Sequence, residues 1–155
     1  MNLPVPPDLQ AAASLAEFGQ LIGIPNLQLD AAGCCQLSFD SRWMVTLLYS
    51  PKLCHWTLSC FLCASGTVIS TDAQHAMLRA NFMGSGCAGG CLSIAADGRP
   101  TLEFRVPADE ASGNALLATI EKLLEQVETW SERVQRSAAT LAVGERPHDW
   151  ILGRV

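Results

Sequence analysis

The sequence predicts an α+β protein in the order α-β-β-β-α-β-β-α, with a twisted antiparallel sheet flanked by helices. Short runs in which apolar and polar residues alternate predict strands with one buried face. Longer runs with helical periodicity stand near both ends of the chain and between the strands. With 155 residues, the chain is expected to form one domain and to bury about two thirds of its extended surface.

The first helix is expected from Asp8, a good N-cap residue after the early prolines, to about Gly23, ahead of Ile24-Pro25. Residues 1–7 are expected to form an extended arm. The helix is apolar on nearly every side, so it requires cover on more than one side. Core packing and a second side that faces a partner both account for this.

Three strands are expected next, over residues 35–40, 45–49 and 54–62. Asp40-Ser41-Arg42 and Ser50-Pro51-Lys52 supply the two turns, so the three strands form a meander. The third strand has one apolar and one more polar face, which is typical of an antiparallel sheet.

A capping box in which Thr71 is the N-cap begins the second helix, which is expected to end near Phe82. Strands over 91–95 and 101–106 follow. Asp97-Gly98 between them is a strong signal for a type I′ hairpin turn, which requires positive φ angles.

The last helix is expected to begin at an Asp109 cap, and its apolar residues from Leu116 to Val134 recur at spacings of four and three. Packing against the sheet and a coiled-coil seam between two copies both fit this stripe. The pattern weakens from Ala138. The sequence therefore predicts one domain over 1–137 and a loosely ordered tail over 138–155.

Charge and hydropathy restrict the function. Fifteen acidic and ten basic residues give a net charge of −5, and no basic cluster of the kind that binds nucleic acid is present. No apolar stretch is long enough for membrane insertion, and a basic signal region is missing because the first basic residue is Arg42. We therefore expect a cytoplasmic protein. Only 16% of the residues are charged, which indicates apolar surface covered by a partner or a second copy.

Seven cysteines without an export signal indicate free thiols. A zinc site built from the two closely spaced pairs is disfavoured, because Cys60 and Cys63 would point to opposite faces of a strand. The glycine-rich segment 84–90 leads into a strand, whereas a phosphate-binding loop leads into a helix. No cofactor, metal or catalytic group is expected. The alternative is a small thiol-dependent enzyme or redox sensor with an accessible thiol of low pKa, drawn from Cys60, Cys63, Cys87 and Cys91.

Five segments in order carry a family resemblance: Phe18…Leu21-Ile22-Gly23-Ile24-Pro25, Cys35-Gln36-Leu37-Ser38-Phe39-Asp40, Leu78-Arg79-Ala80-Asn81-Phe82, Leu92…Ile94…Asp97-Gly98, and the helix from Leu116 to Trp130. Over about residues 12–136 the chain resembles the class I chaperones of bacterial type III secretion, the Tir chaperone (CesT-like) family. Its cysteine count, its glycine-rich loop and its tail depart from that family's pattern.

The resemblance implies a small acidic homodimer in the bacterial cytoplasm that is not an enzyme and uses no nucleotide or metal. It implies binding of the N-terminal region of one secreted effector, which stays soluble and secretion-competent and is passed to the secretion ATPase. The effector segment would use apolar grooves and added strand pairing. A regulator of secretion genes that acts through protein partners is also left open.

The resemblance also implies two sets of contact residues. The effector groove is expected near Leu15, Phe18, Leu21, Ile22, Leu37, Phe39, Val45 and Leu47. The dimer interface is expected at Met77, Leu78, Phe82, Leu92, Ile94, Leu102 and Phe104.

Overall fold

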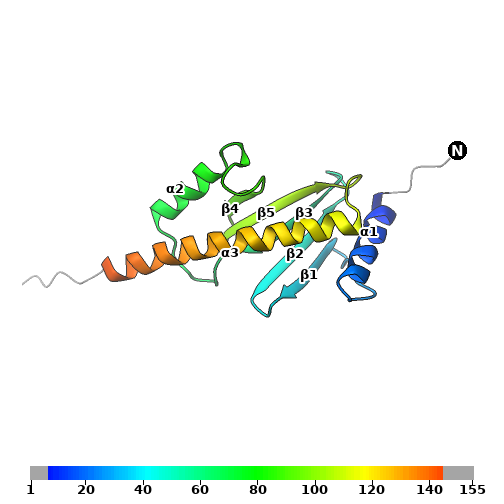
Figure 1. The fold of residues 1–155 in the computed structure, drawn as a ribbon, viewed down its shortest axis with the longest axis horizontal. Helices are drawn as coiled ribbons and strands as arrows, with labels where there is room; N and C mark the ends of the chain where they lie inside the picture. The colour runs from blue at the N-terminus through cyan, green and yellow to red at the C-terminus, as the bar shows by residue number, and fades with distance from the viewer. Residues whose placement is uncertain (1–6, 145–155) are drawn as a thin grey trace, which may run out of the picture.

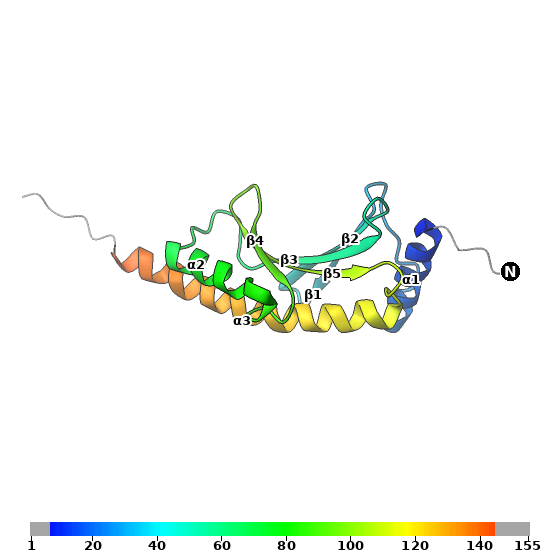
Figure 2. The ribbon, with the colours of Figure 1, turned by 90° about the horizontal axis from the view of Figure 1, so that it is seen from above.

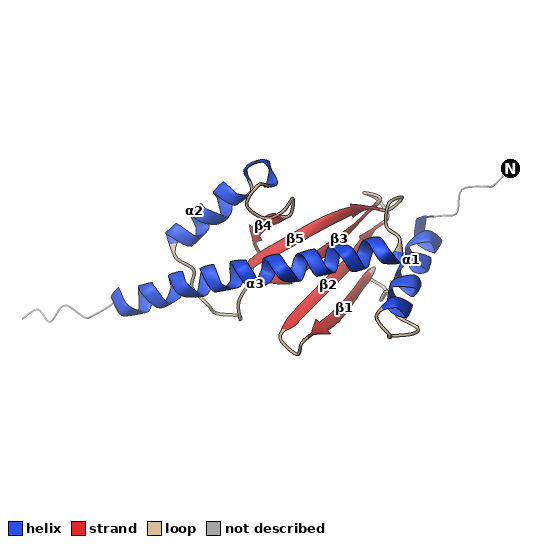
Figure 3. Cartoon of the chain, viewed as in Figure 1, coloured by secondary structure: helices blue, strands red, loops and turns tan. Residues whose placement is uncertain are grey.

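The computed structural model describes residues 7–144, with side chains over 9–137. It contains a five-stranded antiparallel sheet in the order β1-β2-β3-β5-β4, with helices at both ends and across one face (Figures 1 and 3). The elements are α1 (Pro7–Leu21), β1 (Cys34–Phe39), β2 (Trp43–Ser50), β3 (His55–Phe61), α2 (Thr71–Ala80), the 3-10 turn η1 (Phe82–Gly84), β4 (Cys91–Ile94), β5 (Pro100–Pro107) and α3 (Gly113–Gly144).

The long helix α3 covers one face of the sheet, and α1 and α2 lie toward its two ends (Figure 2). Over residues 7–144, no helix lies on the opposite face (Figure 2). Burial follows this arrangement, because side chains along β2 and β3 alternate between buried positions on the α3 face and more exposed positions on the outer face. The outer face includes the exposed side chains of Met44 and Leu48.

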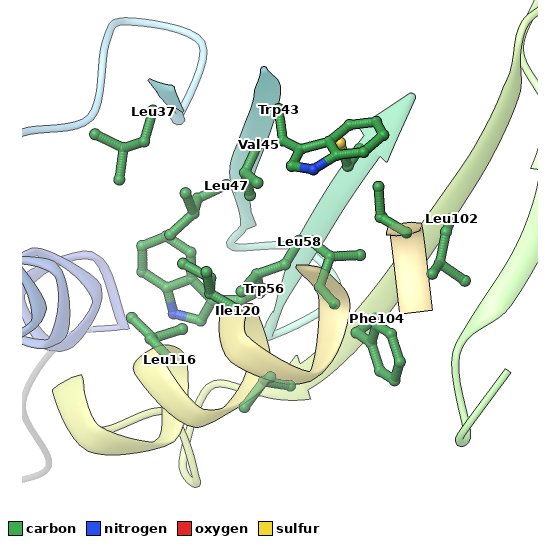
Figure 4. Packing of buried hydrophobic residues seen from close by; sticks show 14 of the residues in the cluster. Leu37, Trp43, Val45, Leu47, Trp56, Leu58, Leu102, Phe104, Leu116 and Ile120 are labelled. Atoms are coloured by element: carbon green, nitrogen blue, oxygen red, sulfur yellow. The ribbon is translucent and has the colours of Figure 1, made fainter. Parts of the chain in front are cut away.

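The core lies between α3 and the sheet. Leu116 and Ile120 of α3 face Trp56, Leu47 and Leu58 of the strands (Figure 4). The whole periodic stripe of α3, from Leu116 to Val134, is buried within the protomer. Packing of α3 within its own protomer therefore accounts for the apolar stripe, and a coiled-coil seam between two copies is not needed to explain it.

Three details of the local structure differ from the sequence predictions. Helix α2 is capped by Ser70, whose Oγ accepts a hydrogen bond from Ala73 N at 3.1 Å, so the box at Thr71 is displaced by one residue. Helix α3 begins after Ser112, whose Oγ accepts from Ala115 N, and not at Asp109.

The hairpin between β4 and β5 is the third difference. Only Gly98 has a positive φ there, at 84°, so the turn is not type I′. Gly98 N donates to Ala95 O, and Ala95 N donates to Arg99 O, as in a three-residue loop with glycine in the left-handed position. Positive φ at two successive residues occurs instead at Asp40 and Ser41, between β1 and β2.

Helix α3 continues to Gly144, so the loosely ordered tail predicted from residue 138 does not begin there. The segment 138–143 consists mostly of alanine and other residues that a helix tolerates, which explains the continuation. The remainder of that tail, 145–155, lies outside the described residues. At the other end, Pro7 already belongs to α1, and residues 1–6 of the predicted arm are also outside them.

Candidate binding surfaces

The first candidate surface is a groove of about 560 Å³ between α1 and the loop that follows it. We call it the α1 groove. No charged side chain lines it, so its character is neutral and largely apolar. Its lining consists of Ala12, Leu15, Ala16, Gln20, Pro25, Asn26, Leu27, Gln28 and Leu29.

Helix α1 is fixed in place by polar contacts distant in sequence. Glu17 Oε2 accepts a hydrogen bond from Gly113 N, the first residue of α3, at 2.8 Å. Gln10 Nε2 donates to Ala108 O at 3.2 Å. A Cβ atom at Gly113 would lie 2.7 Å from Phe18 N, so a side chain there would push the two helices apart. The α1 groove is therefore built on a rigid support.

The second candidate is the outer edge of β1. Cys34 N donates to the Asp30 carboxylate and Cys34 O accepts from Asp30 N, so both groups point away from β2. Because this direction repeats every second residue, the N–H and C=O groups of Gln36 and Ser38 also point outward. Within residues 7–144 no strand pairs with them. The β1 edge is therefore open to one added strand.

The opposite edge of the sheet is blocked at its centre. Asn81, just after α2, places its side-chain amide against β4: Nδ2 donates to Leu92 O and Oδ1 accepts from Leu92 N, both at 2.8 Å. This amide occupies the positions that a neighbouring strand would use. Strand addition at the centre of β4 is thus blocked.

The third candidate is an apolar patch at the α2 end, which we call the α2 patch: Leu78, Phe82, Met83 and Ile94. Leu78 is 68% exposed, Phe82 72% and Met83 89%. Met83 also has a positive φ of 54°, a costly conformation for this residue. So much exposed apolar area on one end indicates a surface that a partner covers.

The predicted groove residues fall into two groups. Leu15, Phe18, Leu37, Val45 and Leu47 are buried in the protomer core. Leu15 reaches the floor of the α1 groove. The other four lie beneath the surface, between the helices and the sheet, so in this structure they support the groove region from inside, and their place near the effector groove stays a prediction. Leu21 is exposed, and Ile22 and Phe39 are half-buried.

The predicted dimer residues divide in the same way. Four of them, Met77, Leu92, Leu102 and Phe104, are buried within one protomer, so they support the surface from inside, and their part in a dimer interface stays a prediction. Leu78, Phe82 and Ile94 are exposed and belong to the α2 patch. Two parts of these surfaces were not predicted from the sequence: Met83 of the patch and the loop residues 25–29 of the groove. Apolar residues in the loop after the first helix were the available signal.

Two of the four candidate cysteines, Cys60 and Cys87, are buried and do not fit a reactive thiol. Burial raises the pKa of the Cys60 thiol to about 11, which is opposite to what a thiolate nucleophile needs. Cys87 is buried, and its Sγ donates to Gly90 O at 2.9 Å. Burial also raises its pKa. Cys63 is half-buried and Cys91 is exposed.

Among the described residues, no three His, Cys, Asp or Glu side chains gather closely enough to hold a metal ion. None of the described helices combines the length and apolar character that a membrane span requires.

The chain matches the profile of a known protein family. The profile of the Tir chaperone protein (CesT) family matches residues 13–131. No curated protein sequence matches the chain significantly.

Several solved structures share the fold. A chain of the ExsC–ExsE complex superposes with a TM-score of 0.71 at 22% identity, over 85% of this chain and 97% of that one. A chain of the HopA1–SchA chaperone–effector complex gives 0.69 at 21%, over 83% and 99%. The structure of the Yersinia pestis type III secretion chaperone SycH with a fragment of YscM2 gives 0.64 at 17%, over 77% and 98%.

Proposed function

Because the chain belongs to the Tir chaperone protein (CesT) family, we propose that it binds the N-terminal region of a secreted effector as an extended segment along β1 and the α1 groove. The bound effector is kept soluble and ready for export. The chaperone works in the bacterial cytoplasm, without catalysis, and as a homodimer, and it passes its effector to the secretion ATPase.

The open edge of β1 is the observation that carries this proposal. The outward N–H and C=O groups of Gln36 and Ser38 offer up to four hydrogen bonds to an added strand, independently of its sequence. The neutral α1 groove is lined in part by the loop that leads into β1. It supplies apolar contacts for the side chains of the bound segment. Main-chain bonding with apolar pockets suits an unfolded segment, which has few other features to recognise.

The α2 patch supports the homodimer. Helix α2 lies alongside the C-terminal half of α3, whereas α1 lies at the N-terminal end of α3 (Figure 1). Self-association through the α2 patch would therefore leave the effector surface accessible. Phe82 and Met83 project from a strained turn, which fits a contact residue better than a core residue.

Ser38→Pro tests the effector surface. Proline removes an outward N–H and is tolerated on an edge strand, so β1 keeps its pairing with β2 while an added strand loses a bond and meets the proline ring. Tagged wild type, Ser38→Pro and the control Ser38→Ala would be purified gently from the native host, with mass spectrometry of the bound proteins.

Wild type and Ser38→Ala should retain one dominant secreted protein through its N-terminal region. Ser38→Pro should retain much less, by about tenfold, since a main-chain bond and the strand's close approach are both lost. Equal retention by Ser38→Pro and Ser38→Ala would contradict strand addition at β1. A wild type that retains no secreted protein would contradict the chaperone role.

A further inference from the structure

A second hollow, outside the α1 groove, opens at the end of the sheet where β1 turns into β2. It has a volume of about 330 Å³. We call it the arginine pocket, because two of the chain's ten basic residues, Arg42 and Arg99, line it. Trp43, Met44 and Phe61 supply apolar walls, and Gln135 of α3 closes one side.

Both guanidinium groups are held against aromatic rings. Arg42 Cζ lies 4.4 Å from the centre of the Trp43 ring, and Arg99 Cζ lies 3.5 Å from the centre of the Phe61 ring. Stacking restrains a guanidinium while leaving its N–H edge available to a carboxylate. The pocket is therefore ordered before any ligand arrives, which lowers the entropy cost of binding.

The charges in the pocket are unequal. Arg99 is neutralised by Asp97, whose carboxylate oxygen lies 2.7 Å from it. Arg42 forms no ion pair with any residue of the part that the structure describes, and Asp40 nearby does not pair with it. Arg42 is exposed to solvent, so its charge is available to an anion of a ligand that enters the pocket.

The turn between β1 and β2 fixes the position of Arg42. Asp40 and Ser41 both adopt positive φ angles, 52° and 53°, and Arg42 N donates to Phe39 O to close the turn, as in a type I′ hairpin. The turn places Arg42 immediately before β2, where its side chain lines the pocket.

We propose that the arginine pocket binds an Asp or Glu side chain of the effector segment, with a neighbouring apolar side chain packed on Met44. This inference rests on the proposed function and specifies its ligand. A strand bonded at Ser38 reaches the turn in a few residues, at about 3.3 Å per residue, so the same segment serves both sites. Its carboxylate accepts hydrogen bonds from Arg42 and completes the charge balance.

The test uses two capped peptides, acetyl-Leu-Asp-Leu-amide and its Asn isostere, titrated into the ¹⁵N-labelled full chain. Amide shifts should concentrate at Arg42, Met44 and Arg99. The Asp peptide should bind about two- to fivefold more tightly than the Asn peptide, as expected for a partly exposed ion pair. Arg42→Gln should abolish this preference, whereas Lys52→Gln, with the same charge change beyond the far end of β2, should keep it.

Equal affinities for the two peptides, or shifts that concentrate elsewhere, would overturn the inference. Because no effector is needed, that result leaves the proposed function standing. The effector identified in the capture experiment gives an independent test. Arg42→Gln should weaken binding of that effector. Replacing one acidic residue of the effector segment by its amide should then weaken binding to the wild-type chaperone but have no further effect on binding to the Arg42→Gln chaperone. Additive losses in this double-mutant cycle would also overturn the assignment.

Discussion

At one end of α3 the helix α1 buries Leu15 and Phe18 completely, whereas at the other end α2 and its following turn leave Leu78, Phe82 and Met83 outside. Both ends are tied to the body by side-chain hydrogen bonds, through Glu17 to Gly113 on one side and Asn81 to Leu92 on the other. The difference lies in where the apolar area goes. The α1 end places its largest apolar side chains inside the protomer, whereas the α2 end leaves them exposed, where we propose that a second copy covers them.

The largest effect should come from Phe18→Ala. This side chain is fully buried between α1 and the body, so its loss leaves a cavity and should lower the free energy of unfolding by about 3–5 kcal/mol. Urea denaturation measures it. Leu21→Ala on the exposed side of α1 is the matched control and should cost less than about 1 kcal/mol. Similar losses in both would mean that the burial of α1 is misassigned.

The next effect concerns assembly. The double variant Leu78→Asp/Phe82→Asp should stay folded but sediment as a monomer at concentrations where the wild type is a dimer, because it places two carboxylates in the α2 patch. Met44→Asp/Leu48→Asp adds the same charges to the outer face of the sheet and should remain dimeric. If the Leu78→Asp/Phe82→Asp variant stays dimeric, the α2 patch is not the dimer contact, and the proposed difference between the two ends is wrong.

A smaller effect should follow from Ser70→Ala. It removes the N-cap bond to Ala73 and should cost about 1 kcal/mol of stability. Because Trp130 Nε1 donates to Gly86 O and Asn81 holds β4, α2 should unfold together with the core. Urea denaturation should therefore show the loss. Faster hydrogen exchange in α2 alone, at unchanged global stability, would identify it as an independently opening unit.

The smallest effect is a pH dependence at the β4–β5 hairpin. Hydrogen bonds from Arg99 lower the pKa of the Asp97 carboxyl below its usual value. A lowered pKa stabilises the fold above the unfolded value of about 3.9, and that contribution disappears as the pH falls through the folded value. An NMR titration should find the lowered pKa, and Arg99→Gln should return it toward normal. An unchanged pKa in that variant would exclude Arg99 as the cause.

How much the sequence could predict differs between elements for physical reasons. The apolar residues of α3 lie on one side of the helix, so its buried face from Leu116 to Val134 was predictable. Helix α1 is apolar on nearly all sides, so the sequence does not show which side is buried. The burial of Phe18 and the exposure of Leu21 could be assigned only from the fold. The strands could be predicted because apolar and polar residues alternate along them. The N-cap of α2 could not, because Ser70 and Thr71 are adjacent and both are good N-cap residues.

The binding surfaces were less predictable because they depend on contacts between distant segments. Asn81 is an ordinary residue for a helix end, and only its position beside Leu92 shows that it closes an edge. Arg42 and Arg99 are 57 positions apart, and no spacing connects them. The resemblance to a chaperone family implied an effector groove near the first helix and a dimer interface elsewhere. Several of the residues that it implied for these surfaces are core residues.

The side-chain amide of Asn81 has a consequence for stoichiometry. A protein that holds an extended strand at one sheet edge risks joining copies head to tail, with the β1 edge of one molecule on the β4 edge of the next, and such a contact grows into an open filament. Because the Asn81 amide occupies the outward N–H and C=O groups of Leu92, the middle of β4 cannot accept the β1 edge of a second copy, which opposes this head-to-tail addition. The edge proposed to take a foreign strand is thus not matched by a second open edge at the centre of β4.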